Sequence, residues 1–441
     1  MSTRTKGNAA NIVGPLWRHI RGRVILAVAL VASAGGVQGI WAATGYEQQP
    51  VLKASQLAPA ELLRGARFQV DEMVPTDGFL ARFTLRSDFG TFEAHGRDML
   101  QIRVAEVAAL EQLDAVSKTE TFAKALGSAV VRPVKAVGQI ITNPVETAKG
   151  VPGGVQRFFG RVKRGATNLW EATTDSDKPS ADRAEEVARR VGGISVDALG
   201  YEQERRQLAK ELKVDPYTTN PVLAAKLDEV AWVTFSARLG INTLTAVLIP
   251  GSMAISGTTF TTDLVWDTPT PELLRLNEQK LRDMGLSNEV VRAMTRNPWY
   301  SLTVLTAFVT GLEQLQGVLG RDAVAKLAAS AASEDQAHFI AEGTQMLVRY
   351  QTTAEPLDTV TAQGTVTART RRGAVVVPAP VDYVAWTQRV AEFARRSDLK
   401  ASERSVWLTG QMSSRAQREL TTAGWRVHED VQWAAPQPAA R

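Results

Sequence analysis

The stretch FLARFTLRSDFGTFEAHGRDMLQIRVAEVAALEQLDAV, residues 79–116, decides the fold of the first half of the chain. Apolar and polar residues alternate over Phe79–Arg86 and Thr91–Ala94, and the turn-forming residues Ser87–Gly90 separate the two runs. This alternation predicts two strands of an antiparallel hairpin. From Arg97 to Val116 apolar residues recur at helical spacing, which predicts a long helix with an apolar surface broad enough to be buried from two sides.

The segments on either side of this stretch complete a first predicted domain, residues 43–172. Phe68–Val74 also alternates, and the Asp-Gly turn in Pro75–Gly78 would connect it to the next strand of a small antiparallel sheet. Residues 119–171 read as short helices interrupted by proline. A polar, charged linker is expected at 173–196.

The middle of the chain, residues 197–352, is predicted to be an all-helical domain. Its helix starts are well marked: Asn220 precedes a proline, Thr270 and Pro271 precede a glutamate, and Ser333 precedes two acidic residues. The side chains of asparagine, threonine and serine accept hydrogen bonds from the free N–H groups of the first helical turn, and proline is tolerated in that turn.

After Pro356 the apolar period returns to two, which predicts a small α/β module over 353–433 and a disordered tail at 434–441. The strands are expected at 358–362, 365–370, 374–377, 405–408 and 426–431, and the helices at 382–396 and 413–422. Together these patterns predict a multidomain, helix-rich α+β fold.

The first 42 residues have the pattern of a secretory leader. Five basic and no acidic residues lie in the first 23 positions, and the apolar run Val24–Val37 follows. We expect cleavage after Ala42, which makes the protein exported, periplasmic or in the cell envelope of a bacterium. The alternative is an uncleaved anchor in the inner membrane, because Val24–Ala43 is about as long as a spanning helix.

Charge and cysteine content exclude several classes of protein. The net charge of +5 comes entirely from the leader, and the remaining chain has 46 basic and 46 acidic residues. A neutral chain has no global field that attracts phosphates, so no nucleic-acid partner is expected. The absence of cysteine excludes disulfides, thiolate metal sites and a cysteine nucleophile. No nucleotide-binding, nucleophile-elbow or metalloprotease motif is present, and no cofactor is predicted.

The strongest candidate for catalysis or metal binding is His338. Glu334 and Glu342 lie four residues on either side, so all three share one helix face. Two carboxylates would raise the histidine pKa, and the trio could offer ligands to one divalent metal ion. The favoured interpretation is nevertheless a solvated, salt-bridged helix face, and no metal site is predicted.

Two weaker candidates involve a carboxylate and a glycine loop. Glu106 lies on an apolar stripe of its helix, so it could be a carboxylate with a raised pKa, although a pair with Arg103 is the favoured alternative. The loop Leu408–Gly410 leads from a strand to a helix that starts at Ser413. Backbone N–H groups there could hold an anion.

One basic, amphipathic segment is the best candidate for membrane or partner contact. Between Arg132 and Gly165 there are seven basic residues and one glutamate. The basic face of such a helix would attract anionic lipid, and the alternative is that the segment packs on the protein's own core. A second stretch, Leu239–Thr262, carries no charge, but its Pro-Gly break makes a spanning helix unexpected and favours a buried loop or hairpin packed on the helical domain. The predicted contact residues of the basic segment are Arg157, Phe158, Phe159, Arg161, Lys163 and Arg164.

These observations favour a non-enzymatic interaction protein or membrane-surface protein, with an envelope protein or an anionic membrane surface as its partner. The alternative is a periplasmic enzyme, most plausibly a hydrolase. A pocket with convergent polar groups and perturbed pKa values would favour the enzyme. An apolar patch with a basic rim would favour the interaction protein.

The leader gives a first testable prediction. Because the residues around Ala42 suit a signal peptidase, the protein purified from the envelope of its native host should begin near Ala43. Intact-mass measurement checks this, and a mass that includes residues 1–42 would identify a membrane-anchored form instead.

Overall fold

The computed structural model describes residues 45–128, 196–237 and 259–431. All of them belong to one compact unit, Gly45–Arg441. The predicted leader, the basic segment, the linker and the tail lie outside the described residues, as does most of the uncharged stretch 239–262. Within the described part, helices predominate and the strands form several small sheets, so the predicted helix-rich α+β fold is confirmed.

The N-terminal sheet is antiparallel, with strand order β2-β3-β5-β6. The predicted hairpin is confirmed by the pairing of Ser87 with Gly90 at its turn. The upstream run, however, is divided between two sheets, because β4 pairs with β1 and meets the next strand only at the bridge Thr76–Ala81. The bounds are β1 (Val51–Lys53), β2 (Arg64–Gly65), β3 (Phe68–Val70), β4 (Met73–Pro75), β5 (Arg82–Ser87) and β6 (Gly90–His95).

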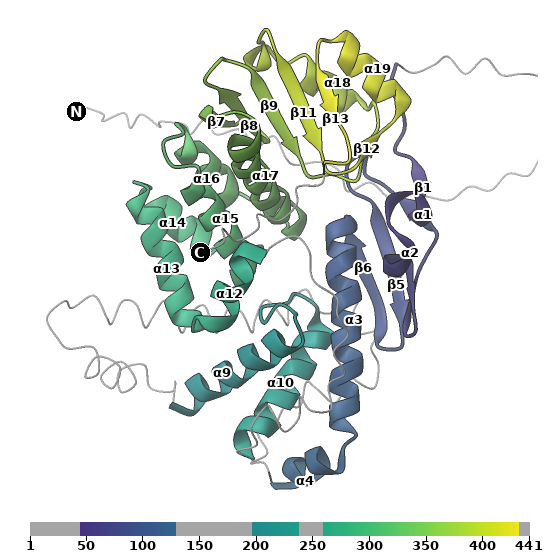
Figure 1. Cartoon of the computed structure of the whole chain (residues 1–441), viewed down its shortest axis with the longest axis vertical. Helices are drawn as coiled ribbons and strands as arrows, with labels where there is room; N and C mark the ends of the chain where they lie inside the picture. The colour runs from purple at the N-terminus through teal and green to yellow at the C-terminus, as the bar shows by residue number, and fades with distance from the viewer. Residues whose placement is uncertain (1–44, 129–195, 238–258, 432–441) are drawn as a thin grey trace, which may run out of the picture. The chain divides into compact units, whose positions relative to one another are not determined.

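The long helix α3 (Arg97–Ser117) lies against this sheet, as Figure 1 shows. Phe83 and Leu85 of β5 point toward it and are fully buried. The opposite side of α3 contacts α10 (Pro221–Ser236), so the prediction that the helix is buried from two sides is confirmed. Three short helices flank this layer: α1 (Ala54–Leu57), α2 (Ala60–Leu63) and α4 (Glu120–Ser128).

The described residues between 196 and 353 contain helices but no named strand, as predicted. Two predicted caps are present: the Asn220 side-chain oxygen accepts the N–H of Val222 at 3.0 Å, and Ser333 Oγ accepts the N–H of Gln336 at 3.2 Å. Thr270 is not a cap, because it is the first helical residue of α13 and Pro269 precedes it at the N-cap position. Besides α10, the helices are α9 (Val196–Glu211), α12 (Thr259–Asp267), α13 (Thr270–Asp283), α14 (Asn288–Thr295), α15 (Leu302–Gln314), α16 (Arg321–Ala329) and α17 (Glu334–Thr353).

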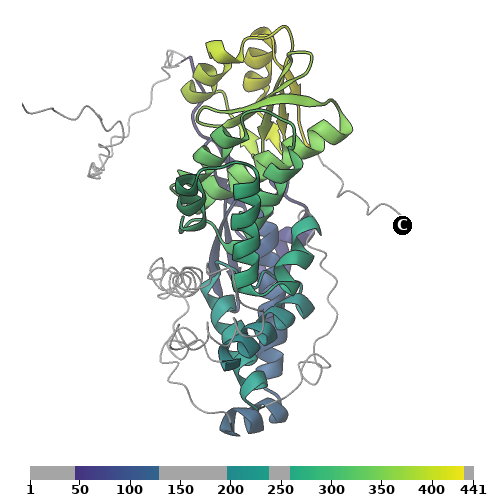
Figure 2. The ribbon, with the colours of Figure 1, turned by 90° about the vertical axis from the view of Figure 1, so that its left-hand side faces the viewer.

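The C-terminal module is a five-stranded sheet with order β13-β11-β9-β8-β7. Strands β9, β11 and β13 are parallel to one another, and β7 and β8 are antiparallel. The helices α18 and α19 pack on one face and α17 on the other (Figures 1 and 2). The bounds are β7 (Leu357–Ala362), β8 (Val366–Thr370), β9 (Val375–Ala379), β11 (Arg404–Leu408), β13 (Arg426–His428), α18 (Gln388–Ala394) and α19 (Ser414–Thr422).

One predicted helix of this module is wrong in its first turns. The expected helix 382–396 begins only at Gln388, and it is followed by a short 3-10 turn, Ser397–Leu399. The residues before it form β10 (Tyr383–Val384), which pairs in parallel with β12 (Gln411–Met412). Backbone groups of 382–386 are therefore used by strand pairing and by long-range hydrogen bonds.

The apolar side chains form three main clusters, and the first two cross the boundaries of the helical segment. The first joins the N-terminal sheet and α3 to α9 and α10. The second joins the helices between 274 and 350 to the inner face of β7, β8 and β9. The third fills the space between the parallel strands and α18 and α19. The domain boundaries proposed from the sequence stay a prediction, since the linker at 173–195 lies outside the described residues.

Polar groups link the first cluster to the second. Asp215, in the loop between α9 and α10, accepts hydrogen bonds from the N–H of Tyr217 at 2.7 Å and from Thr303 Oγ1 at 2.6 Å, both through Oδ1. Burial raises the pKa of this carboxyl to about 6, although both hydrogen bonds oppose that shift. The charged form of Asp215 therefore destabilises the folded protein at neutral pH.

Asp215→Asn should stabilise the protein at pH 8 and lose most of that advantage near pH 4. The raised pKa means that Asp215 favours folding below its unfolded value of 3.8 and that this contribution is lost as the pH rises through about 6. Asparagine keeps an acceptor at Oδ1 without the charge, so we expect a gain of up to about 3 kcal/mol at pH 8. Urea unfolding of the wild type and the variant at both pH values measures this gain. An equal gain at both pH values would contradict the raised pKa of Asp215.

Candidate functional site

The larger of two adjoining cavities lies at the carboxyl ends of the parallel strands. Its volume is about 210 Å³, and we call it the strand-end cavity. Among its lining residues Asp382 follows β9, Gly410 and Gln411 follow β11, and Asp430 follows β13. In open α/β sheets this edge is where ligands bind. The other wall includes Gln56 of α1 and Arg97 of α3.

Glycine is required at position 410 by close packing. A Cβ atom there would lie 2.0 Å from the carbonyl oxygen of Asp382. The same carbonyl accepts the N–H of Gln411 at 3.0 Å, and the carbonyl of Gly410 accepts the N–H of Asp430 at 2.9 Å. Asp430 has a left-handed φ of 49°. The three strand ends are thus joined by backbone hydrogen bonds around the cavity.

A carboxylate of the chain itself, Glu47, lies at the start of α19, where the sequence suggested that an anion could bind. Glu47 Oε2 accepts hydrogen bonds from Ser413 Oγ and from the N–H of Trp386, both at 2.5 Å. A carboxylate beside a helix N-terminus interacts favourably with the helix dipole. The glycine loop predicted from the sequence therefore has two roles: Gly410 lines the strand-end cavity, and Ser413 donates a hydrogen bond to Glu47.

Asp382 is the carboxylate shared by the two cavities. Its Oδ2 accepts the N–H of Ala81 at 2.8 Å, and its Oδ1 accepts the N–H of Arg97, the first residue of α3, at 2.9 Å. Burial raises the pKa of Asp382 to about 6, and the charge of Asp98 raises it further, while the two N–H groups oppose the shift. Sequence reasoning missed this residue, because it placed Asp382 in a helix.

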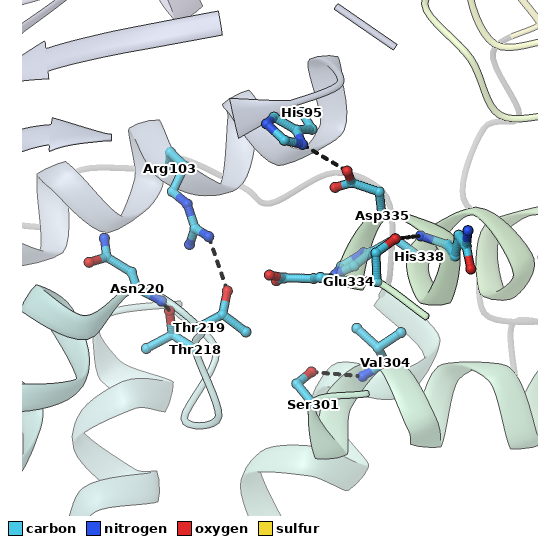
Figure 3. Close-up of polar contacts among 12 residues, drawn as sticks. His95, Arg103, Thr218, Thr219, Asn220, Ser301, Val304, Glu334, Asp335 and His338 are labelled. Carbon is cyan, nitrogen blue, oxygen red and sulfur yellow. Dashed lines mark hydrogen bonds and ion pairs between the residues drawn. The ribbon is translucent and has the colours of Figure 1, made fainter. Parts of the chain in front are cut away.

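The smaller cavity, about 40 Å³, contains the predicted candidate His338, and we call it the His338 cavity. Glu342, Asp98, His95 and Asp382 also line it. His338 Nε2 lies 3.9 Å from Glu334 Oε1 (Figure 3), and only 24 % of the histidine side chain is exposed. The predicted solvated helix face is therefore wrong, because this face of α17 lies over the start of α3.

The pKa values in the His338 cavity differ from those that the sequence suggested. Burial lowers the pKa of His338, and this effect outweighs the opposing charge of Glu334. Burial, together with the charges of Asp98 and Asp382, raises the pKa of Glu342 well above its usual range. The predicted rise in the pKa of His338 was wrong. The prediction treated the helix face that carries His338 as solvated, whereas burial has the largest effect on its pKa.

A second histidine, His95 at the end of β6, joins this region to α17. Its Nδ1 lies 2.8 Å from Asp335 Oδ2 (Figure 3), and this hydrogen bond raises the pKa of His95. The two histidines therefore have opposite shifts: the hydrogen bond to Asp335 raises the pKa of His95, and burial lowers the pKa of His338.

Glu106 is the centre of a buried polar cluster. Its predicted pair with Arg103 is confirmed by a distance of 2.8 Å between Arg103 Nη1 and Glu106 Oε2. Glu106 also accepts hydrogen bonds from Asn220 Nδ2 at 3.0 Å and from the hydroxyl of Thr218. The guanidinium group of Arg103 donates to Thr219 Oγ1 at 3.0 Å (Figure 3). The cluster fixes the loop before α10 against α3.

The remaining candidates are placed as follows. The predicted membrane-contact residues of the basic segment lie outside the described residues. Within the described ranges, no group of three or more His, Asp and Glu side chains is arranged to hold a metal ion. None of the helices described is both long and apolar enough to cross a membrane. No family model, curated protein or solved structure matches this chain.

Glu106→Ala should destabilise the protein by about 3–5 kcal/mol, because it leaves the buried guanidinium of Arg103 without its counter-charge. Asp114→Ala on the same helix is the control. It removes only a surface pair with Lys118, so its effect should stay below about 1 kcal/mol. Urea unfolding of both variants measures the difference in stability. Equal effects would show that the buried polar cluster around Glu106 does not stabilise the fold more than a surface pair does.

Proposed function

We propose that this protein is a non-enzymatic binding protein of the bacterial cell envelope that holds a small polar ligand in the strand-end cavity. The observation that carries the proposal is the position of that cavity, at the carboxyl ends of β9, β11 and β13. Parallel strands that end together leave backbone groups and loop side chains directed at one place, which suits ligand binding.

The composition of the cavity supports binding rather than simple packing. Its walls include the side chains of Arg97, Gln56, Gln411 and two aspartates, which offer donors and acceptors around a space open to solvent. Its volume of about 210 Å³ is below the roughly 300–1,000 Å³ of pockets for drug-sized ligands. We therefore expect a ligand smaller than a typical drug.

The proposed location in the bacterial cell envelope is supported by the leader pattern of residues 1–42. The basic segment with Arg157, Arg161, Lys163 and Arg164 is the proposed contact with an anionic membrane surface or an envelope protein. In this proposal the segment would keep the protein near the envelope, and the strand-end cavity would bind the ligand.

A second candidate, a hydrolase, is favoured by one specific observation. In the His338 cavity, burial keeps the imidazole of His338 neutral and raises the pKa of the Glu342 carboxyl. Environments that shift two neighbouring groups in opposite directions produce a general base and a general acid. The cavity of about 40 Å³ has space for a few water molecules but not for a substrate, which makes this the weaker candidate.

A ligand screen tests the proposal. A library of small polar compounds, studied with the mature full-length protein by ligand-observed NMR, should give binders that Gln56→Trp abolishes. Gln56 is exposed at the rim of the cavity, so the indole should fill the opening without disturbing the core. Glu61→Trp on the neighbouring helix α2 is also an exposed substitution but does not line the cavity, so it should leave binding unchanged.

The same spectra separate the two candidates. Binding without chemical change, lost in Gln56→Trp, supports the binding protein. Conversion of a compound to new products, lost in His338→Gln, would favour the hydrolase. A library with no binder sensitive to Gln56→Trp would refute the proposed function.

A further inference from the structure

We propose that the strand-end cavity selects small molecules that carry an ammonium or guanidinium group. This inference rests on the proposed function and names its ligand class. It is carried by two carboxylates, those of Asp382 and Asp430, that line one cavity and receive only uncharged donors from the described residues.

The two carboxylates accept hydrogen bonds only from uncharged groups of the described residues, although the charge of Arg97 offsets part of the charge of Asp382. Asp382 accepts two backbone N–H groups, from Ala81 and Arg97. Asp430 Oδ2 accepts the side-chain amide of Gln411 at 3.1 Å. Neither is joined to a cationic side chain by a salt bridge within the described part of the chain. Carboxylates in this state form strong, charge-assisted hydrogen bonds with a cationic donor.

Arg97 is the cation that lines the same cavity, and its single positive charge offsets only part of the charge of the two acids. Its guanidinium group lines the cavity but donates to the backbone carbonyl of Thr409 at 2.9 Å. One guanidinium and two ionised carboxylates leave a net charge of −1 in the lining. Asp98 increases this negative potential, since its charge raises the pKa of Asp382.

The positions of the two acids allow their contributions to be tested separately. Asp430 is exposed at the rim, with its backbone in the left-handed region that asparagine also tolerates. Asp430→Asn therefore removes the charge while keeping the backbone and an acceptor for Gln411. Asp382, in contrast, uses each oxygen for a different N–H group, so its charge is better changed by pH than by substitution.

Three linear probes of equal length test the inference: 1,5-diaminopentane, 1,5-pentanediol and glutarate, which are cationic, neutral and anionic at neutral pH. We expect the diamine to bind at least tenfold more tightly than the diol, and glutarate to bind most weakly. Asp430→Asn should weaken binding of the diamine at least fivefold. Asp283→Asn is the matched control, because Asp283 is also an exposed carboxylate that accepts a glutamine amide, from Gln279 at 2.7 Å.

The pH dependence gives a second readout. The charged or titratable groups facing Asp382 are Arg97 and Asp98 on α3 and Glu342 on α17. Because burial raises the pKa of Asp382 to about 6, the carboxyl is mainly ionised at pH 7.5 and mainly protonated at pH 5. Affinity for the diamine, measured by calorimetry, should therefore fall from pH 7.5 to pH 5, while affinity for the diol should not.

Each other result overturns the inference in a defined way. Glutarate or the diol binding as tightly as the diamine, with binding lost in Gln56→Trp, would keep the cavity as a binding site and refute the cation class. Unchanged diamine binding in Asp430→Asn would also refute it, as would binding of none of the three probes. The proposed function itself fails only if the larger library gives no binder sensitive to Gln56→Trp.

Discussion

The structure depends most on the hydrogen bonds made by Asp382. Its carboxylate accepts the first N–H of α3 and the N–H of Ala81, and its carbonyl accepts the N–H of Gln411. The first N–H groups of a helix have no partner within that helix, and the helix dipole favours a negative charge there. The C-terminal module thus supplies the cap of the N-terminal helix, and both cavities exist where these two parts meet.

Structural features that depend only on residues close together in the chain were predictable from the sequence. Asn220 and Ser333 cap helices as expected, and the Ser87–Gly90 turn joins the predicted strands. The Arg103–Glu106 pair was also predictable, because three residues on a helix place both side chains together. In each case the signal and the structure it determines lie in one short segment.

The features that failed depend on residues far apart in the chain. Residues 382–386 were assigned to a helix, but Glu47 binds the N–H of Trp386 and Gln411 pairs with Tyr383. The pKa of His338 was assigned the wrong direction because the sequence shows Glu334 but not the burial of their shared face. One available signal was used only in part: the predicted strand–helix–strand order around Gly410 implies parallel strands, and the carboxyl ends of parallel strands are the usual ligand edge.

The shared carboxylate also implies that the two cavities are energetically coupled. The charge of Asp382 raises the pKa of Glu342 in the His338 cavity. A cation in the strand-end cavity would favour the ionised form of Asp382, and ionised Asp382 favours the protonated form of Glu342. Linkage is reciprocal: protonation of Glu342 removes a repelling charge, which favours ionised Asp382 and so would strengthen cation binding there. Glu342 on α17 would therefore contribute to the energetics of the proposed binding site without touching the ligand.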